Sequence, residues 1–544
     1  MATLALRIEG MTCAHCAETV RRALESLPQV RARVSYPEAV AEIEAPAGTD
    51  AAALVEAVRR AGYRAEPLAP GARRAGGGDG AGLHVAVVGG GSAAFACALR
   101  AAERGARVTI IETGTVGGTC VNVGCVPSKI LLRQAHVRHL AGHHPFEGLE
   151  RRAPVVDAAA LAAHRAARVA ELRHAKYEAL VESNPAITLV RGRARFEDAH
   201  TLRVTLAGGE RTIRADRILI ATGARPAVPP VPGLDDTPYW TSTEALAAGH
   251  VPASLLVLGG SAVGLELAQG FARLGARVTV LELADRILPQ ADADVSEALR
   301  AALEAEGIAL RTGTAAGRVG HRDGRFRIET TDGAFEAEAL LVATGRRPNT
   351  DGLGLERAGV ETDARGAILV DERLRTSAPD VYAAGDCAAL PQLVYVAAAA
   401  GTRAAENMTG NEARLDLDVL PWVVFTDPQA AGVGLTETEA RGRGLEVETR
   451  VLALDQVPAA LARFDTRGMV KLVAERGTGR LLGAHVVAAE GGEVIQSAAL
   501  ALRAGFTVHD LGEQLFPYLT MAEGLRLCAQ TFERDVARLS CCAG

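Results

Sequence analysis

The stretch LHVAVVGGGSAAFACALRAAERGARVTIIET, residues 83–113, reads in order as a strand, a glycine turn, a helix and a second strand. Its apolar run Val85–Val88 is typical of a buried strand. The positions that match the G-x-G-x-x-G/A pattern are Gly89, Gly91 and Ala94. Small residues there let a pyrophosphate approach the helix N-terminus, and Glu112, at the end of the second strand, is placed to hold a pair of ribose hydroxyls. The stretch therefore predicts a nucleotide site on an α/β sheet.

A second stretch, SLLVLGGSAVGLELAQGFARLGARVTVLEL at residues 254–283, repeats this pattern. Its motif positions are Gly259, Ser261 and Gly264, so a serine replaces the middle glycine, and it is small enough to keep the turn. Two copies this far apart predict two separate Rossmann-like dinucleotide-binding domains. Glu282 ends the second strand of this copy, and a carboxylate there favours NADH because it repels a 2′-phosphate. Arg286 lies four residues on and would oppose that preference, so NADPH stays open.

The composition excludes several classes of protein. The chain has 544 residues, of which 48% are hydrophobic, and this length predicts three or four domains. A net charge of −6 argues against a nucleic-acid-binding protein. The sequence has no run of about 18 uncharged apolar residues that would predict a membrane span. Arg7 and Glu9 interrupt the apolar run that a signal peptide needs, so a cytoplasmic location is expected.

The N-terminal 68 residues predict a small domain of their own. Their apolar spacing alternates between strand and helix periods in the order βαββαβ, the ferredoxin-like pattern. Cys13 and Cys16, in GMTCAHC, form a C-x-x-C pair at the start of the first helix, and two sulfurs at this spacing can face one soft metal ion. Residues 69–82 are rich in glycine and predict a flexible linker.

A second cysteine pair lies in GGTCVNVGCVPSK, residues 117–129. Cys120 and Cys125 are five residues apart and stand at the start of a predicted helix, whose positive end lowers the pKa of a thiol. Such a pair can close a disulfide and reopen it by taking two electrons. We therefore expect a redox-active dithiol.

This segment, together with ATGARP at 221–226, ATGRRPN at 343–349 and YAAGDC at 382–387, resembles the flavin-dependent pyridine-nucleotide disulfide oxidoreductases. The resemblance covers about residues 83–535. It implies FAD on the first dinucleotide fold, NADH or NADPH on the second, and a homodimer. It also implies a pairing of Lys129 with Glu266 near the two cofactors. The other cofactor-binding residues that it implies are Gly118, Thr119, Ala194, Thr222, Gly223, Asp386 and Val394.

The resemblance also implies a division of the chain into domains. After the linker we expect an FAD-binding domain whose two parts are interrupted by the NAD(P)-binding domain, then an α+β dimerisation domain and a tail. The expected boundaries are 1–68 for the metal-binding domain, 69–82 for the linker, 83–230 and 349–420 for the FAD-binding domain, 231–348 for the NAD(P)-binding domain, 421–535 for the dimerisation domain and 536–544 for the tail.

Two features depart from the disulfide reductases of this family. Those enzymes carry a His-Pro-x-x-x-Glu run near the C-terminus, whose histidine protonates a departing thiolate. Here Tyr518 stands in place of the histidine, and a tyrosine, with a reference pKa of about 10, is a poor general base near neutrality. In addition, the C-terminus ends in an adjacent pair, Cys541 and Cys542, on a predicted mobile tail that can carry a soft cation.

These features, and an N-terminal segment similar to the heavy-metal-associated domain, resemble the mercuric reductase branch of the family. The resemblance implies that NAD(P)H reduces Hg(II) to Hg(0) through the flavin. Hg(II) bound to thiols would pass from Cys541 and Cys542 of one subunit to Cys120 and Cys125 of the other. Tyr177, in HAKYE, would lie beside the metal together with Tyr518. The N-terminal pair would collect the ion.

Two alternatives stay open at this point. One is a reductase similar to dihydrolipoamide dehydrogenase, which the segment LELADRILP, residues 281–289, favours and Tyr518 opposes. The other is a protein that sequesters soft metals without catalysis, which the intact dithiol and Lys129 oppose.

Overall fold

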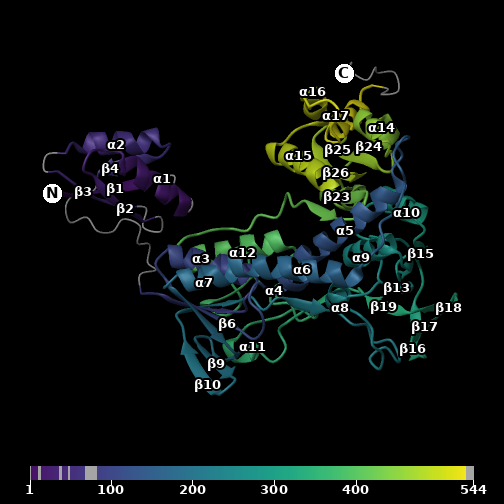
Figure 1. The fold of residues 1–544 in the computed structure, drawn as a ribbon, viewed down its shortest axis with the longest axis horizontal. Helices are drawn as coiled ribbons and strands as arrows, with labels where there is room; N and C mark the ends of the chain where they lie inside the picture. Colours follow the sequence, from purple (N-terminus) through teal and green to yellow (C-terminus); the bar gives the residue numbers. More distant parts are fainter. Residues whose placement is uncertain are drawn as a thin grey trace. The chain divides into compact units, whose positions relative to one another are not determined.

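The computed structural model describes residues 2–9, 11, 14–35, 40–46, 49–67 and 82–534 (Figure 1). The chain forms two compact units, and each is built from three separate segments. One unit takes Met1–Val116, Ala179–Gly223 and Thr350–Leu415, and the other takes Gly117–Glu178, Ala224–Asn349 and Asp416–Gly544. Among the described residues, no helix is both long and apolar enough to cross a membrane.

The N-terminal domain is a four-stranded antiparallel sheet with two helices, and it confirms the ferredoxin-like prediction (Figure 1). Its sheet order is β2-β3-β1-β4. Alternate residues of β1 face the helices, so Leu6 and Ile8 are buried with Val20 and Leu24 of the first helix. The elements are β1 (Ala2–Glu9), α1 (Ala14–Glu25), β2 (Arg31–Ser35), β3 (Val40–Ala45), α2 (Ala51–Arg60) and β4 (Arg64–Pro67).

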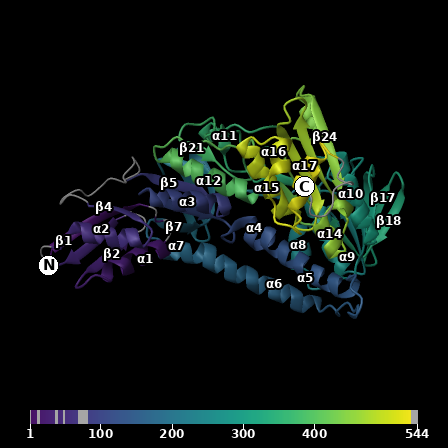
Figure 2. The same cartoon turned by 90° about the horizontal axis from the view of Figure 1, so that it is seen from above.

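The rest of this unit is built on a five-stranded parallel sheet, in the order β21-β11-β5-β6-β7. Every residue of β5 is buried, because helix α3 packs on one face of the sheet and the strands β8, β9 and β10 cover the other. Helices α3 and α12 lie side by side, and a Cβ at Gly401 would clash with the backbone of Ala93 (Figures 1 and 2). The elements are β5 (His84–Val88), α3 (Ser92–Glu103), β6 (Arg107–Glu112), α7 (Ala179–Ser183), β7 (Ile187–Arg191), β8 (Arg193–Asp198), β9 (Thr201–Leu206), β10 (Gly209–Arg214), β11 (Arg217–Ile220), α11 (Leu355–Ala358), β21 (Val381–Ala383) and α12 (Val394–Met408).

The second unit contains a four-stranded parallel sheet, in the order β15-β14-β13-β19. Strand β13 is buried on both faces: Leu255 and Val257 pack against α9 and α10, whereas Leu256 and Leu258 pack against β16 and β17. The elements are β12 (Ala224–Pro226), α8 (Ser242–Ala247), β13 (Ser254–Leu258), α9 (Ala262–Leu274), β14 (Arg277–Leu281), α10 (Ala293–Ala305), β15 (Ala309–Arg311), β16 (Ala316–Arg322), β17 (Arg325–Thr330), β18 (Gly333–Ala337), β19 (Ala339–Val342) and β20 (Arg346–Pro348).

A group of helices in the same unit carries the second cysteine pair. Helix α5 packs on α9 at Gly270, where a Cβ would lie only 2.5 Å from the Leu131 side chain. Helix α6 contacts both α4 and α5, and α5 and α6 are the long helices of Figure 2. The elements are α4 (Gly118–Val123), α5 (Cys125–His143), α6 (Ala158–Arg173) and the π-helical turn η1 (His174–Glu178).

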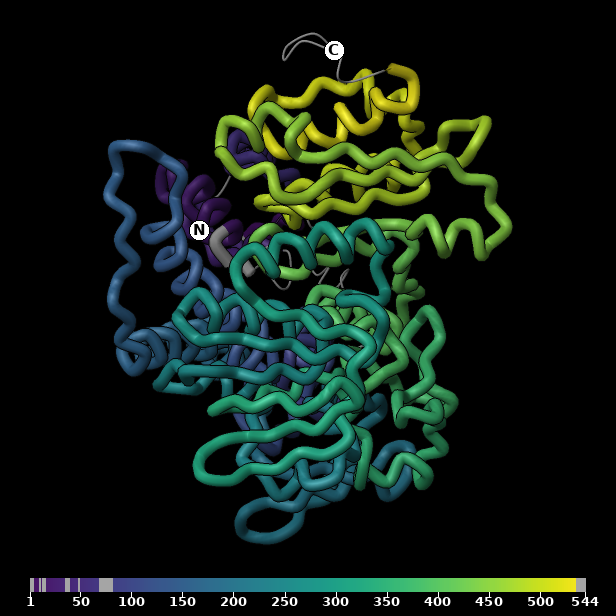
Figure 3. The backbone as a smooth tube through the Cα atoms, turned by 90° about the vertical axis from the view of Figure 1, so that its right-hand side faces the viewer, coloured from purple at the N-terminus to yellow at the C-terminus, as the bar shows by residue number. Residues whose placement is uncertain are grey.

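The C-terminal domain is a five-stranded antiparallel sheet, in the order β22-β23-β26-β25-β24. Helices α15 and α17 cover one face, as the yellow segments of Figure 3 show. On β25, Val470 and Leu472 point to that face, whereas Met469 points to the other, toward the second parallel sheet. The elements are β22 (Trp422–Val424), β23 (Gln429–Gly434), α13 (Glu437–Gly442), β24 (Val447–Ala453), η2 (Leu454–Gln456), α14 (Pro458–Arg463), β25 (Met469–Glu475), β26 (Leu481–Ala488), α15 (Gly491–Ala504), α16 (Val508–Glu513) and α17 (Glu523–Gln530).

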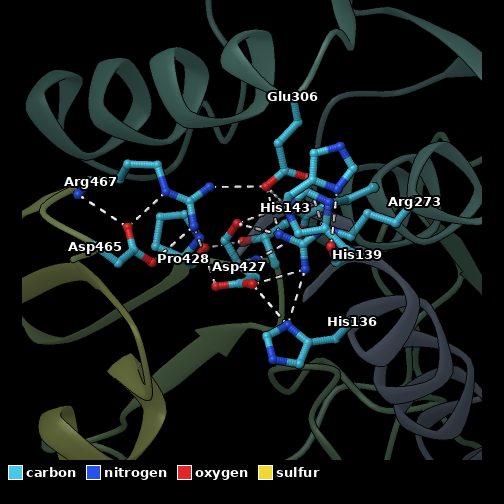
Figure 4. Close-up of polar contacts among 11 residues, drawn as sticks. His136, His139, His143, Arg273, Glu306, Asp427, Pro428, Asp465 and Arg467 are labelled. Carbon is cyan, nitrogen blue, oxygen red and sulfur yellow. Dashed lines mark hydrogen bonds and ion pairs between the residues drawn. The ribbon is translucent and has the colours of Figure 1, made fainter. Parts of the chain in front are cut away.

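A buried charge network fastens α9 to the segment before β23 (Figure 4). Arg273, whose side chain is 4% exposed, donates to Glu306 at 2.6 and 2.8 Å and to the Asp427 carboxylate at 2.8 Å. Arg467 donates to Glu306 at 3.0 Å, and a ring nitrogen of His136 lies 3.0 Å from Asp427. Burial alone would raise the pKa of Asp427, but the His136 hydrogen bond and the Arg273 charge hold that pKa well below its usual range.

Candidate active site

The predicted cysteine pair lies where two helices meet. Cys120 is on α4, and Cys125 is the first residue of α5. Gly124 joins the two helices, and a Cβ there would lie 2.8 Å from the carbonyl oxygen of Thr119, so the helices approach each other closely at this point. Both cysteines are reduced and partly buried. The structure therefore presents a dithiol rather than two isolated core cysteines.

The two thiols differ in acidity. A hydrogen bond from Cys120 lowers the pKa of Cys125 to about 7, although burial opposes this, and the nearby Lys129 ammonium lowers it further. The same hydrogen bond, together with burial, raises the pKa of Cys120. The hydrogen bond and the charge of Lys129 therefore favour the thiolate on Cys125 and the proton on Cys120.

Lys129 is held in place by two groups, a carboxylate and an aromatic ring. Its ammonium lies 2.7 Å from a carboxylate oxygen of Glu266 on α9, and 4.4 Å from the centre of the Phe425 ring. The other oxygen of Glu266 accepts a hydrogen bond from the Phe425 backbone N–H at 2.9 Å. Lys129 and Glu266 are therefore an ion pair, with the partner that the sequence resemblance implied.

Tyr177 lies in the π-helical turn η1, at the end of α6. A Cβ at Gly117, the residue before α4, would lie 3.4 Å from a carbon of the Tyr177 ring. The tyrosine therefore reaches the start of the helix that carries Cys120.

The first glycine turn, in the other unit, fits a dinucleotide such as FAD. Gly89 has a φ of +115°, and a Cβ there would clash with the carbonyl oxygen of Ala221. Gly91 caps α3 without a side-chain acceptor, so the first N–H groups of the helix are left for an anion such as a pyrophosphate. Glu112 lies across the turn, 2.8 Å from where a Cβ of Gly90 would be. Ala94 is fully buried behind the turn.

Other predicted flavin contacts of this unit meet at one edge of its sheet. Thr222 and Gly223 follow β11, and Asp386 follows β21, which is the parallel neighbour of β11. The Cys387 thiol donates to the carbonyl oxygen of Ile220 at 3.4 Å and ties the two ends together. Ala194 is buried on β8, and Val394 begins α12. Gly118 and Thr119 begin α4, in the other unit.

The second glycine turn lines a cavity of about 690 Å³. A Cβ at Gly259 would clash with the carbonyl oxygen of Ala343, just as a Cβ at Gly89 would clash with that of Ala221. A Cβ at Gly264 would clash with the carbonyl oxygen of Gly259. Ser261 has a φ of −108°, close to the −91° of Gly91. The serine is therefore accommodated because this position does not need the left-handed region that favours glycine.

Glu282 is held at the entrance to this turn by two backbone donors. Its carboxylate accepts from the Gly260 N–H at 2.5 Å and from the Ala284 N–H at 2.8 Å. Arg286 donates instead to the carbonyl oxygens of Pro289 and Ala291. Among the described residues that line the cavity, Glu282 is the one anion and Arg346 the one cation. Arg346 donates to the carbonyl oxygen of Ala224.

Tyr518 is half exposed, between α16 and α17, next to the exposed Leu515 and Leu519. Cys16 is the third residue of α1. Cys13, Cys541 and Cys542 lie outside the described residues.

The comparisons with known proteins agree with this geometry. The profile of the pyridine nucleotide-disulphide oxidoreductases matches residues 83–401, the profile of their dimerisation domain matches residues 420–529, and that of the heavy-metal-associated domain matches residues 5–64. The chain belongs to the pyridine nucleotide-disulphide oxidoreductase family. Members of this family pair through the dimerisation domain, and the chain is accordingly a homodimer.

Within the family the chain is similar to mercuric reductases along nearly its whole length. It is 56% identical to the mercuric reductase of Acidithiobacillus ferrooxidans, over 99% of this chain and 98% of that one. It is 54% identical to that of Shigella flexneri, over 99% of this chain and all of that one. Among solved structures, the flavoprotein disulfide reductase RclA from Escherichia coli is 31% identical, with a TM-score of 0.74 over 82% of this chain and 99% of that one. The predicted resemblance to mercuric reductases is confirmed, and so are the two dinucleotide-binding folds with a metal-binding domain before them.

Several residues that contact the predicted site residues carry no signal in the sequence. The ring of Phe425 covers Lys129 from a distant segment, and Arg173 reaches α4 from the end of α6. A Cβ at Gly117 would contact the Tyr177 ring, and this close approach is visible only in the folded chain.

Proposed function

We propose that this chain reduces Hg(II) to Hg(0) with FAD and NAD(P)H, as a homodimer. The observation that carries the proposal is the reduced dithiol Cys120–Cys125 at the junction of α4 and α5, in a chain whose position 518 is a tyrosine rather than an acid–base histidine. A metal held by two sulfurs does not need the proton that the histidine would supply. The similarity to mercuric reductases over nearly the full length supports the same substrate.

The chain's own residues account for capture of the metal. The Cys125 thiolate attacks Hg(II) that arrives as a complex with two thiolates, and one thiolate leaves. Cys120 then forms the second sulfur–mercury bond, and its proton leaves on the second displaced thiolate. Each step replaces one sulfur by another, so no bare ion is released. When bound, FAD would supply the electron pair that NAD(P)H delivers, and both cysteines would be left as thiolates.

Four further residues and two cysteine pairs complete the proposed site. Lys129, held by Glu266, stabilises the Cys125 thiolate. Tyr177, and Tyr518 from the partner subunit, would border the metal. Cys541 and Cys542 would hand Hg(II) to the dithiol, and Cys13 and Cys16 would collect it. Because this chemistry needs reduced thiols, we place the enzyme in the cytoplasm.

For the nicotinamide coenzyme we propose a preference for NADH. The carboxylate of Glu282 is fixed by two backbone N–H groups where a ribose 2′-hydroxyl would bind, and Arg286 is engaged by carbonyl oxygens of its own loop. A 2′-phosphate would face this carboxylate, whereas Arg286 and Arg346, the cation that lines the cavity, both donate to backbone carbonyl oxygens. Calorimetric titration should show NAD⁺ binding at least about tenfold more tightly than NADP⁺, which corresponds to about 1.4 kcal/mol.

The Glu282→Ala variant should reduce the ratio of the affinities for NAD⁺ and NADP⁺. Glu297→Ala, which removes an exposed carboxylate of α10, should leave this ratio unchanged. Equal affinities of the unmodified protein for the two nucleotides would contradict the preference.

The function itself is tested with the purified, FAD-loaded dimer. NAD(P)H oxidation is followed with and without Hg(II) in excess thiol, while volatile mercury is trapped. We expect one Hg(0) for each NAD(P)H oxidised, loss of turnover in Cys120→Ser, and full turnover in a Cys13/Cys16 double serine variant. A Cys541/Cys542 double alanine variant should lose turnover when thiol is in excess. Oxidation of NAD(P)H that does not depend on Hg(II) would contradict the proposal.

A further inference from the structure

The turn that carries Tyr177 has an unusual geometry. Residues His174–Glu178 form a π-helical turn directly after α6. A π turn closes hydrogen bonds between residues five apart, whereas an α turn spans four, so the side chains that follow point in a different direction than a continued α-helix would give them. The outcome here is that Tyr177 is half-buried, whereas His174, Ala175 and Lys176 are exposed.

Arg173 lies at the junction of α6 and this turn and contacts the last residue of the turn, Glu178. Its Nε donates to the carboxylate of Glu178 at 3.3 Å. The two residues are five apart in sequence, which is the separation that a π turn brings together. Glu178 also lies 3.4 Å from the ring of His174. The carboxylate of Glu178, the last residue of the turn, therefore contacts the first residue, and Arg173 holds that carboxylate in place.

The other side of the Arg173 guanidinium contacts the redox helix. Its Nη1 donates to the side-chain oxygen of Asn122 on α4 at 3.2 Å, and the Asn122 amide donates to the carbonyl oxygen of Gly118 at 2.9 Å. Gly118 and Asn122 stand on either side of Cys120 in α4. The guanidinium thus connects the helical turn that bears Cys120 with the turn that bears Tyr177.

Gly117 gives the tyrosine room to approach. A Cβ at this position would lie 3.4 Å from the Tyr177 ring and 3.4 Å from the Asn122 amide nitrogen, and it would clash with Val121. Gly117 also has a φ of +97°, which favours glycine. The ring of Tyr177 and the side chain of Asn122 therefore meet at the same point before α4.

We propose that Arg173 is a positioning residue, which sets Tyr177 against the redox dithiol through Asn122 on one side and Glu178 on the other. The proposal rests on the proposed reduction of Hg(II), because Tyr177 is expected to act on the metal and not on hydride transfer. Loss of the guanidinium should then weaken the step that uses the metal and leave reduction of the flavin by NADH unchanged.

The test is a double-mutant cycle between Arg173→Met and Tyr177→Phe in the FAD-loaded dimer. Arg173→Met alone should lower kcat for Hg(II) by about tenfold, with the rate of flavin reduction by NADH in the absence of metal changed by less than about twofold. In the Tyr177→Phe background, Arg173→Met should change kcat by less than about twofold, because the two residues act as a unit. Arg168→Met is the matched control, since Arg168 lies on the same helix and pairs with the exposed Glu171.

Three results would overturn the proposal. The first is that the effects of the two substitutions on kcat multiply in the double variant. The second is that Arg173→Met has the same kcat for Hg(II) as the unmodified enzyme. The third is that Arg173→Met slows Hg(II) turnover and flavin reduction equally. If Arg173→Met does not give a folded flavoprotein, Arg173→Lys replaces it, because a lysine reaches only one of the two partners and should give a smaller loss of kcat. Failure of the unmodified enzyme to release Hg(0) would instead contradict the proposed function.

Discussion

At the scale of single residues, the Cys125 sulfur accepts a hydrogen bond from Cys120 and lies near the Lys129 ammonium, and its pKa is lowered to about 7. Its thiolate should therefore persist below the pH at which an ordinary cysteine, with a pKa of about 8.5, ionises. The alkylation rate of Cys125 in the reduced enzyme, followed by mass spectrometry against pH, should rise with a midpoint near that value.

Lys129→Met should move this midpoint to higher pH by about one unit or more, because it removes a cation and leaves the buried Glu266 carboxylate without the Lys129 counter-ion. Arg133→Met, one turn further along α5 and exposed, should leave the midpoint in place. An unchanged midpoint in Lys129→Met would show that the lysine does not stabilise the thiolate.

At the scale of elements, one face of α9 holds the segment 425–427 through Glu266, Gln269 and Arg273. Arg273→Met would leave the carboxylates of Glu306 and Asp427 buried without their main partner, and we expect a loss of about 3–5 kcal/mol in unfolding free energy. Arg503→Met removes an exposed ion pair with Asp416 and should cost less than about 1 kcal/mol. Urea denaturation of the two variants measures both.

The loss of unfolding free energy in Arg273→Met should depend on pH. Burial would raise the pKa values of Asp427 and Glu306, but their hydrogen bonds and the Arg273 charge hold both below the unfolded values in the native chain. Their stabilisation is therefore present above the unfolded pKa of about 4 and is lost as the pH falls through the folded values. The difference between Arg273→Met and the unmodified protein should accordingly be largest near neutral pH and shrink in acid. A difference that grew in acid would contradict this account.

At the scale of the whole molecule, the proposed site takes Cys120 and Cys125 from one subunit and Tyr518, Cys541 and Cys542 from its partner. Two inactive variants should then complement each other. Co-expression of Cys125→Ser with the Cys541/Cys542 double alanine variant should restore about a quarter of normal Hg(II) turnover, because half of a random mixture of dimers would carry one intact site of two. The same mixture made from purified homodimers that do not exchange subunits should stay inactive. Absence of activity in the isolated mixed dimer would place the tail on its own subunit's dithiol.

The sequence alone determined the parts of this protein that depend on neighbouring residues. These parts are the glycine turns, the ferredoxin-like order, the C-x-x-C pair and the dithiol. Each is local, because a tight turn needs residues that permit its backbone conformation and the positive end of a helix acts on the residues that begin that helix. The tertiary structure decided the rest. Glu266 and Phe425 meet Lys129, and Asn122 meets Arg173, only because α4, α5, α6, α9 and the segment before β23 pack together. The lowered pKa of Cys125 and the place of Tyr177 follow from those contacts, since charge and hydrogen bonding act through space and not along the chain.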